Sequence, residues 1–197
     1  MAVNQLERCE WARSEPNVSY HDQEWGVPLH NEVRLFEMLI LEGAQAGLSW
    51  TTILKKREGY RLVYRGFHPE KVAAFDQADV NRLLADASIV RNRAKIAASI
   101  LNARAVLEIR SEFGSLDRFL WSFVNGSPIQ NAWTNFGQVP TKTEISDRLS
   151  QALLGRGMKF VGSTICYALM QATGMVNDHL VTCPQYEIVK NLGASEA

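Results

Sequence analysis

The chain has 197 residues, of which 46% are hydrophobic and 21% charged, as expected for one globular domain or two closely packed lobes. This composition excludes a long repeat array, a disordered chain and a fibrous protein. Acidic and basic residues balance at 21 each, so no global field draws the chain to nucleic acid or to a membrane. Any such partner must be bound by a local patch.

The apolar runs and the cysteines indicate the cellular compartment of the protein. No apolar run approaches a membrane span, and the amino-terminal sequence MAVNQLERCEW lacks the apolar core of a signal peptide. Cys9, Cys166 and Cys183 are too few and too widely spaced for a disulfide framework. We therefore expect a cytoplasmic protein with reduced thiols, without membrane association, without an obligatory protein partner, and monomeric.

Helical periodicity dominates from residue 31 onward. Asn31 can cap a helix that stops at Gly47, and Ser49 can cap a second that continues to residue 67, although Gly59 weakens its middle. Further helical patterns follow at 69–75, 77–85, 91–113, 115–124, from Thr143 or Ser146 to 154, and at 163–173. Residues 125–142 are the one long segment without a period. The sequence predicts an all-α fold.

Two cysteines and two histidines form the first candidate site. Cys9 and His21 lie near one end of the chain, and His179 and Cys183 near the other. The latter pair has the i, i+4 spacing that lets two side chains in one helical turn face the same point. Two thiolates and two imidazoles suit tetrahedral zinc, and four protein ligands leave no position for a reactive water, which favours a structural clasp. The spacing also fits two unrelated pairs of core residues.

The segment DASIVRNRAKI, residues 86–96, is the second candidate site. A short turn precedes a helix whose free N–H groups, with Arg91, Arg93 and Lys95, can hold a phosphate. It is similar to a helix-hairpin-helix element, and an ordinary connection with solvated basic residues is the alternative. The basic run at 55–57 is the other local source of positive charge.

A third candidate site combines an acid with aromatic residues. Glu42 lies on an otherwise apolar helix close to a helix junction, where pockets form, and Trp50 follows that junction. Tyr20 and Trp25 belong to another aromatic segment and can serve as stacking platforms for a base. Alternatively, Glu42 is a solvated helix charge and the aromatic residues are core.

A series of segments, in order along almost the whole chain, resembles the bacterial 3-methyladenine DNA glycosylase I family. The matching segments are ERCEW at 7–11, YHDQEWGVP at 20–28, LFEMLILEGAQAGLSW at 35–50, ILKKRE at 53–58, IVRNRAKI at 89–96, WSFVN at 121–125, KFVGSTICYALMQATGMVNDH at 159–179, and Cys183. The resemblance implies a single domain over 1–197 with the fold of the helix-hairpin-helix glycosylase superfamily. Its two helical lobes are expected at 1–48 plus 126–197 and at about 49–125.

The resemblance also assigns site residues. It implies a structural zinc that joins the N- and C-terminal segments, with the ligands Cys9, His21, His179 and Cys183. It implies a base pocket between the lobes, formed by Glu42, Tyr20 and Trp50 and lined or supported by Trp11 and Trp25. Ser88 stands where a hairpin glycine is expected, and a positive φ there would be strained.

The implied activity is hydrolysis of the N-glycosidic bond of 3-methyladenine in alkylated double-stranded DNA, which leaves an abasic site without cutting the strand. Methylation at N3 makes adenine a cation, which a carboxylate and aromatic faces distinguish from neutral adenine. Glu42 is the candidate catalytic residue, acting on water or by binding alone. The base must leave the duplex, and we expect Leu48 to press into the gap while Arg91, Arg93 and Lys95 contact phosphates.

Two other functions stay open. A zinc hydrolase with Glu42 as general base requires an open metal position. A lesion-binding module would recognise the damaged base without turnover.

Overall fold

The computed structural model describes residues 8–194, so the first seven residues of the segment read for a signal peptide lie outside it. Within 8–194 no helix is long and apolar enough to cross a membrane. The α-helices of this range are α1 (Asn17–Gln23), α2 (Glu32–Gln45), α3 (Trp50–Val63), α4 (Pro69–Ala73), α5 (Gln77–Ala85), α6 (Arg93–Phe113), α7 (Leu116–Trp121), α8 (Glu144–Gly155), α9 (Ser163–Ala172) and α10 (Pro184–Ala194).

The shorter elements are the 3-10 helices η1 (Arg65–Phe67), η2 (Ser122–Val124) and η3 (Phe136–Gln138) and the strands β1 (Ile129–Gln130) and β2 (Val176–Asn177). The two strands pair in parallel. This pair departs from the all-α prediction, but at two residues a strand it leaves the molecule helical. It ties the segment without a period to the C-terminal part of the chain.

The helix starts follow the predicted caps. The Asn31 side chain accepts a hydrogen bond from the N–H of Arg34 at 3.1 Å, and Ser49 accepts one from Thr52 at 3.2 Å. The helix that Ser49 caps ends at Val63 rather than at residue 67, because the chain turns into η1 with Gly66 in a left-handed conformation.

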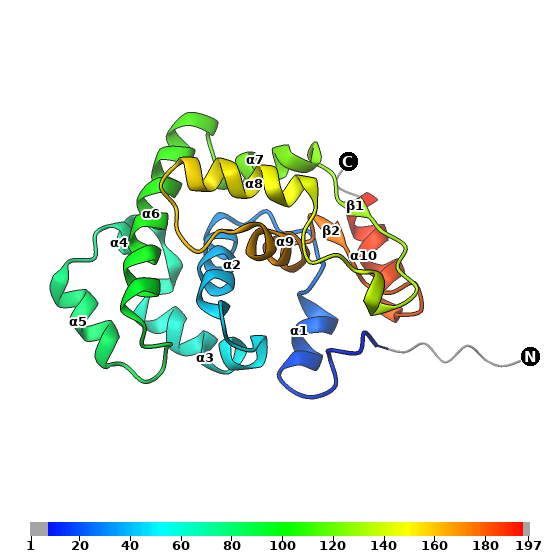
Figure 1. The fold of residues 1–197 in the computed structure, drawn as a ribbon, viewed down its shortest axis with the longest axis horizontal. Coiled ribbons are helices and arrows are strands. Elements are labelled where there is room, and N and C mark those ends of the chain that lie inside the picture. Colours follow the sequence, from blue (N-terminus) through cyan, green and yellow to red (C-terminus); the bar gives the residue numbers. More distant parts are fainter. Residues whose placement is uncertain (1–7, 195–197) are drawn as a thin grey trace, which may run out of the picture.

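Helix α2 lies at the centre of the molecule, where α3, α6, α7 and α9 pack against it. Every residue from 35 to 44 is buried, as expected for a helix covered on all sides. In Figure 1, α4, α5 and α6 lie at one end, and α10 with the strand pair lies at the other. The lobe boundaries near residues 48 and 125 stay a prediction.

The predicted hairpin packs against α3 at Gly59. A Cβ atom there would lie 2.6 Å from the Cβ and the carbonyl oxygen of Ser88. Lys56 Nζ donates to the carbonyl of Ala87 at 2.6 Å, and the N–H of Val90 donates to the Tyr60 hydroxyl at 3.2 Å. The glycine expected only to weaken the helix is therefore what lets the hairpin approach. Ser88 does not have a positive φ, so the expected strain is absent.

We expect Gly59→Ala to lower the free energy of unfolding by about 1–3 kcal/mol, the cost of overpacking, although alanine gains about 1 kcal/mol in helix propensity. Urea denaturation measures the change. Gly155→Ala is the control, because its Cβ meets no atom within 4 Å, and this variant should be neutral or more stable. Equal stability of Gly59→Ala and the native protein would contradict the close-approach argument.

Candidate functional site

A pocket of about 140 Å³ opens beside the C-terminal half of α2. It is smaller than the roughly 300 Å³ and above that drug-sized ligands occupy, as suits one nucleobase. The five residues that the sequence assigned to a base pocket all line it: Trp11, Tyr20, Trp25, Glu42 and Trp50.

Glu42 is the acid of this pocket. Its side chain belongs to the buried helix α2, and the residue is only 5% exposed. Burial raises the pKa of Glu42 to about 8, because a charged carboxylate loses its hydration there. Within residues 8–194 it forms no hydrogen bond or ion pair. A buried carboxyl group without a partner is unfavourable for folding, so the reading of Glu42 as a solvated helix charge is wrong.

Two other polar groups in the pocket lack partners. The Tyr20 hydroxyl and the Trp50 indole N–H are buried without a hydrogen bond, and each such group costs about 1–3 kcal/mol. The two rings are in contact, with centroids 5.3 Å apart and planes at 54°. An aromatic wall with two free polar groups therefore faces the same pocket as the free carboxyl group of Glu42.

The two further tryptophans differ in position. Trp11 is half-buried and touches the rings of Tyr20 and Trp25, with centroid distances of 6.2 and 5.0 Å. Trp25 is buried and extends to the imidazole of His179, 4.7 Å away between centroids. Trp25 therefore lies between the pocket and the cysteine–histidine cluster, and a change in either can reach the other through this ring.

The pocket has four lining residues that sequence reasoning did not assign to it: Gln45, Phe136, Ala168 and Gln171. Phe136, in η3, belongs to the segment without a period, and it lines the pocket while 37% exposed. Gln171, at the end of α9, lines it as well. The aromatic residues of that segment, Trp133 and Phe136, indicate that it packs against the rest of the protein, but they do not indicate that it reaches the pocket.

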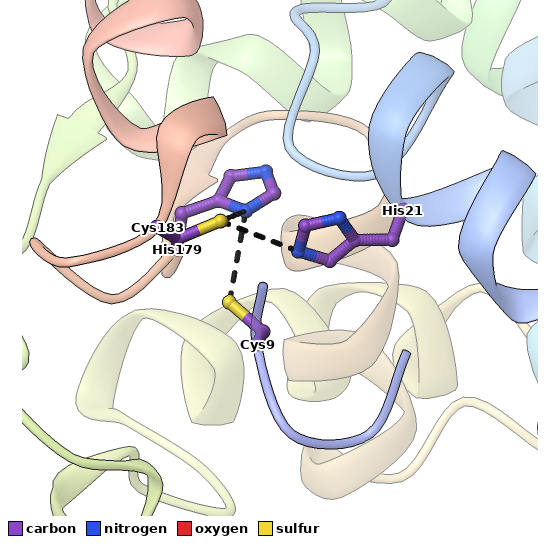
Figure 2. Close-up of side chains that lie close together, drawn as sticks. All are labelled: Cys9, His21, His179 and Cys183. Atoms are coloured by element: carbon purple, nitrogen blue, oxygen red, sulfur yellow. Dashed lines mark hydrogen bonds between the residues drawn. The ribbon is translucent and has the colours of Figure 1, made fainter. Parts of the chain in front are cut away.

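The four predicted metal ligands converge, and all are buried. Their ligand atoms lie within 4.8 Å of one another, and Figure 2 shows both sulfurs and both rings facing a common point. Cys183 Sγ lies 3.6 Å from His21 Nε2 and 3.7 Å from His179 Nδ1, and Cys9 Sγ lies 3.8 Å from His179 Nδ1. Zinc at about 2.3 Å from sulfur and about 2.0 Å from nitrogen requires S···N separations of about 3.6 Å. The residues thus fit a tetrahedral metal ion.

The outer contacts of the histidines support this geometry. His179 Nε2 lies 2.9 Å from the carbonyl oxygen of Trp25, and His21 Nδ1 lies 2.7 Å from Asp22 Oδ1. Arg8 also donates to Asp22, at 2.9 and 2.7 Å, and holds the pKa of that carboxyl group at about 2. Such partners fix the ring tautomer and leave the other nitrogen for a metal.

The backbone at this cluster differs from the prediction. His179 and Cys183 lie in turns before α10, not in a helical turn. The N–H of Cys183 donates to the carbonyl of Leu180 at 2.8 Å. The two side chains therefore meet because of a tight turn rather than through helical spacing.

Asp178 is a buried hydrogen-bonding centre next to the cluster, and no pattern in the sequence singled it out. Asp178 is 0% exposed, and its carboxyl group accepts four side-chain hydrogen bonds of 2.7–2.8 Å. The donors are Asn131, Trp133, Tyr167 and Gln171. The first two belong to the segment that carries Phe136, and the last lines the pocket, so Asp178 fixes one side of the pocket.

We expect Asp178→Asn to lower the free energy of unfolding by about 2–4 kcal/mol, because either orientation of the amide turns its NH₂ group toward two donors and leaves them unpaired. Thermal and urea denaturation measure this loss. Asp147→Asn is the control: Asp147 has an ion pair with Lys142 at 3.4 Å, and its loss should cost less than about 1 kcal/mol. Equal effects of the two variants would show that the four hydrogen bonds contribute little.

The predicted DNA-contacting residues do not share one environment. Arg91 and Arg93 are exposed and have no side-chain partner in the part of the chain that the structure describes. Leu48 is 41% exposed on the turn after α2. Lys95 is half-buried, and its Nζ donates to backbone carbonyls of α2 and the following residue.

The basic run at 55–57 does not form a patch, contrary to the prediction. Arg57 is buried, with ion pairs to Glu37 at 2.5 Å and to Glu24 at 2.8 Å. Lys56 is bound to the hairpin carbonyl of Ala87. Its pairing with two acids makes Arg57 a link between α2, α3 and the end of α1.

The chain is similar in sequence to known methyladenine glycosylases. A sequence profile described as methyladenine glycosylase matches residues 11–186. The chain is 53% identical over 182 residues to the DNA-3-methyladenine glycosylase 1 of Escherichia coli K12, covering 92% of this chain and 97% of that protein. It is 46% identical over 178 residues to the DNA-3-methyladenine glycosylase of Haemophilus influenzae, covering 90% and 96%.

The fold is also similar to solved structures. A crystal structure of a tyrosine-to-phenylalanine variant of a 3-methyladenine DNA glycosylase I, in complex with 3-methyladenine, matches with a TM-score of 0.88 at 37% identity. The match covers 91% of this chain and 97% of that one.

Proposed function

The chain belongs to the methyladenine glycosylase family, and from this premise we propose how its pocket excises 3-methyladenine from alkylated DNA. The reaction is hydrolysis of the N-glycosidic bond in base-excision repair, which releases the free base. The observation that carries the proposed mechanism is the unpaired carboxyl group of Glu42, buried in one pocket with the free polar groups of Tyr20 and Trp50.

Charge selects the substrate in this mechanism. N3-methylated adenine in DNA is a cation, and its approach favours the ionised form of Glu42, which burial otherwise disfavours. The faces of Tyr20 and Trp50 add cation–π attraction and stacking. Neutral adenine can stack, but it gains neither the ion pair nor the cation–π attraction and leaves a buried carboxyl group unsatisfied. Discrimination therefore comes from the same desolvation that makes the empty pocket unfavourable.

The same positive charge activates the leaving group. When the bond between C1′ and N9 breaks, its electron pair moves to the base and neutralises the charge. A water oxygen then bonds to C1′ and its proton passes to the solvent, so the products are the neutral free base and an abasic sugar. Glu42 binds the cationic base and holds the extruded nucleotide in place for this step, in a site from which bulk water is largely excluded. The strand itself is not cut.

The DNA must present the base outside the duplex. We assign Leu48 to the gap that the extruded nucleotide leaves, because it is apolar and exposed on the turn beside Glu42. Arg91 and Arg93, exposed at the start of α6, are assigned to phosphates. With a net charge of zero, few phosphate contacts are available, so affinity should be weak and moderately salt-dependent.

We also propose that the cysteine–histidine cluster holds zinc. Two thiolates and two imidazoles at tetrahedral separations are the ligand set that zinc prefers. When bound, the ion would join the N- and C-terminal segments, and four protein ligands leave it no position for a reactive water. The cluster would then stabilise Tyr20 and Trp25, which flank His21 in the sequence, rather than take part in chemistry.

The test is release of base from duplex DNA treated with a methylating agent, analysed by chromatography. We expect free 3-methyladenine and an intact strand. Binding of the alkylated duplex without release would identify a lesion-binding module instead. Loss of chemistry on chelation, in a protein that stays fully folded, would identify a zinc hydrolase.

The pKa of Glu42 predicts a pH dependence. Because burial raises that pKa to about 8, the free enzyme holds the inactive, protonated form at neutral pH. We expect kcat/KM to rise about tenfold per pH unit below that value and to level above it, whereas kcat, which reports the complex with the cationic base, should depend less on pH. Steady-state rates between about pH 6 and pH 9 check this. A flat kcat/KM profile would exclude a carboxylate with this pKa.

A further inference from the structure

The C-terminus of α2 is held by a residue from another helix. The last carbonyl groups of a helix have no partner within it and form the negative end of its dipole. Lys95 Nζ lies 2.8 Å from the carbonyl oxygen of Ala44 and 2.6 Å from that of Ala46. A lysine ammonium at this position supplies both hydrogen bonds and a favourable charge.

The backbone that Lys95 holds leads directly into the turn of Leu48. Ala46 ends α2 with an extended ψ of 116°, and Gly47 follows with φ of 77°. The N–H of Leu48 then donates to the carbonyl of Gln45 at 2.6 Å. Among residues 8–194, only Lys95 donates a hydrogen bond to the carbonyl of Ala46, so the turn has few other restraints.

Lys95 itself belongs to the hairpin. It lies in the first turn of α6, and its N–H donates to the capping side chain of Asn92 at 3.1 Å. Arg93, assigned to phosphates, is two residues before it. The Lys95 side chain therefore connects the start of α6, assigned to the DNA backbone, with the turn that carries Leu48, which lies four residues beyond Ala44 and two beyond Ala46.

We propose that Lys95 is a positioning residue for base excision. Through the carbonyls of Ala44 and Ala46 it holds the turn at Gly47 so that Leu48 enters the duplex when the hairpin docks. This inference rests on the proposed function, and it gives Lys95 a role other than the phosphate contact predicted from the sequence. The ammonium group has two protein acceptors and is half-buried, so it is a poor partner for a phosphate.

Lys95→Met tests the role, because methionine keeps an unbranched apolar stem and removes the donors. We expect the variant to fold, to bind free 3-methyladenine like the native protein, and to release the base from duplex DNA about tenfold more slowly under single-turnover conditions. Lys71→Met, at a lysine without a side-chain hydrogen bond on α4, is the matched control for loss of one charge and should keep the native rate.

The double variant with Leu48→Ala decides whether Lys95 acts through Leu48. If it does, Lys95→Met should add little to the loss that Leu48→Ala already causes, since effects through one element are not additive. Independent, multiplying losses would overturn the proposal. So would a fall of about one in the slope of log affinity against log salt, which indicates a direct phosphate contact, or a native rate in Lys95→Met.

Failure of the variant to fold and failure of the proposed function give different results. If Lys95→Met does not fold, Lys95→Arg keeps the charge with a different donor geometry, and its coupling to Leu48→Ala is judged by the same criterion. If the native protein releases no base from alkylated duplex, the proposed function fails, and the variants are not the cause.

Discussion

Glu42→Gln is expected to remove nearly all base release and, at the same time, to stabilise the protein above neutral pH. Glutamine keeps the size of the side chain but cannot pair with a cationic base, and the loss of one such electrostatic contact typically lowers kcat by about 10²–10³. The buried carboxyl group forms no hydrogen bond or ion pair within residues 8–194, so its replacement breaks no native contact. Catalysis and folding therefore make opposite demands on this position.

The sign of the stability change follows from linkage. The pKa of Glu42 is about 8 in the folded protein and about 4.3 in an unfolded chain. The folded state therefore holds the proton more tightly, and stability is complete below the unfolded value and lost as pH rises through about 8. Glutamine does not titrate, so at about pH 8 the variant should be more stable by a few kcal/mol.

Denaturation at about pH 5 and about pH 8 measures this difference, and single-turnover assays measure base release. The variant should gain stability chiefly at the higher pH. Glu108→Gln, at an exposed position of α6, is the control and should leave both the rate and the pH dependence unchanged. A variant that releases base at the native rate, or that is less stable at the higher pH, would contradict the role assigned to Glu42.

The helices were largely predictable because local signals determine them. Asn31, Ser49 and Thr143 cap helices as expected, and the periodic stretches from 69 to 113 match α4, α5 and α6 closely. Helices α1 and α10 were not predicted. The first has only seven residues and no side-chain cap, and the second follows the turn of the cysteine–histidine cluster, so tertiary contacts define both.

The pocket was predictable in its residues but not in its geometry. Glu42 stood out because a carboxyl group on an apolar helix requires an explanation, and burial shows that it is not a solvated charge. Phe136 and Gln171 reach the pocket through the fold alone, one on a segment without a period and the other through its hydrogen bond to Asp178. A single sequence gives no signal for contacts of that kind.

Basic residues were the least predictable class. In the sequence, Arg57 and Lys95 look like any exposed cation, yet one pairs with Glu37 and Glu24 and the other binds the end of α2. Periodicity shows which face of a helix is apolar, but not which long side chain crosses to a neighbouring helix. Only Arg91 and Arg93 stay exposed without side-chain partners among the described residues of the hairpin.

Loss of the proposed zinc ion is expected to lower the free energy of unfolding by several kcal/mol, a fraction of the 10–16 kcal/mol with which structural zinc binds small peptides. The loss of stability is smaller than in zinc-finger peptides because the buried core around α2 persists without the ion. The cluster joins residues 9 and 21 to residues 179 and 183, and contacts through Trp25 link it to the pocket. Base release should therefore fall together with structure as metal is removed, in contrast to a catalytic metal.

The measurement combines metal content with denaturation, on the native protein and on Cys183→Ser. We expect about one zinc per chain in the native protein, and in the variant a lost ion and a lower Tm. Cys166→Ser is the matched control, since that buried thiol lies outside the cluster and donates to the carbonyl of Val161 at 3.2 Å, a hydrogen bond that serine can also form. It should keep its metal. A native protein that loses its metal and retains both Tm and base release would show that the four residues are no clasp, whereas retained Tm with lost release would indicate that the metal takes part in the chemistry.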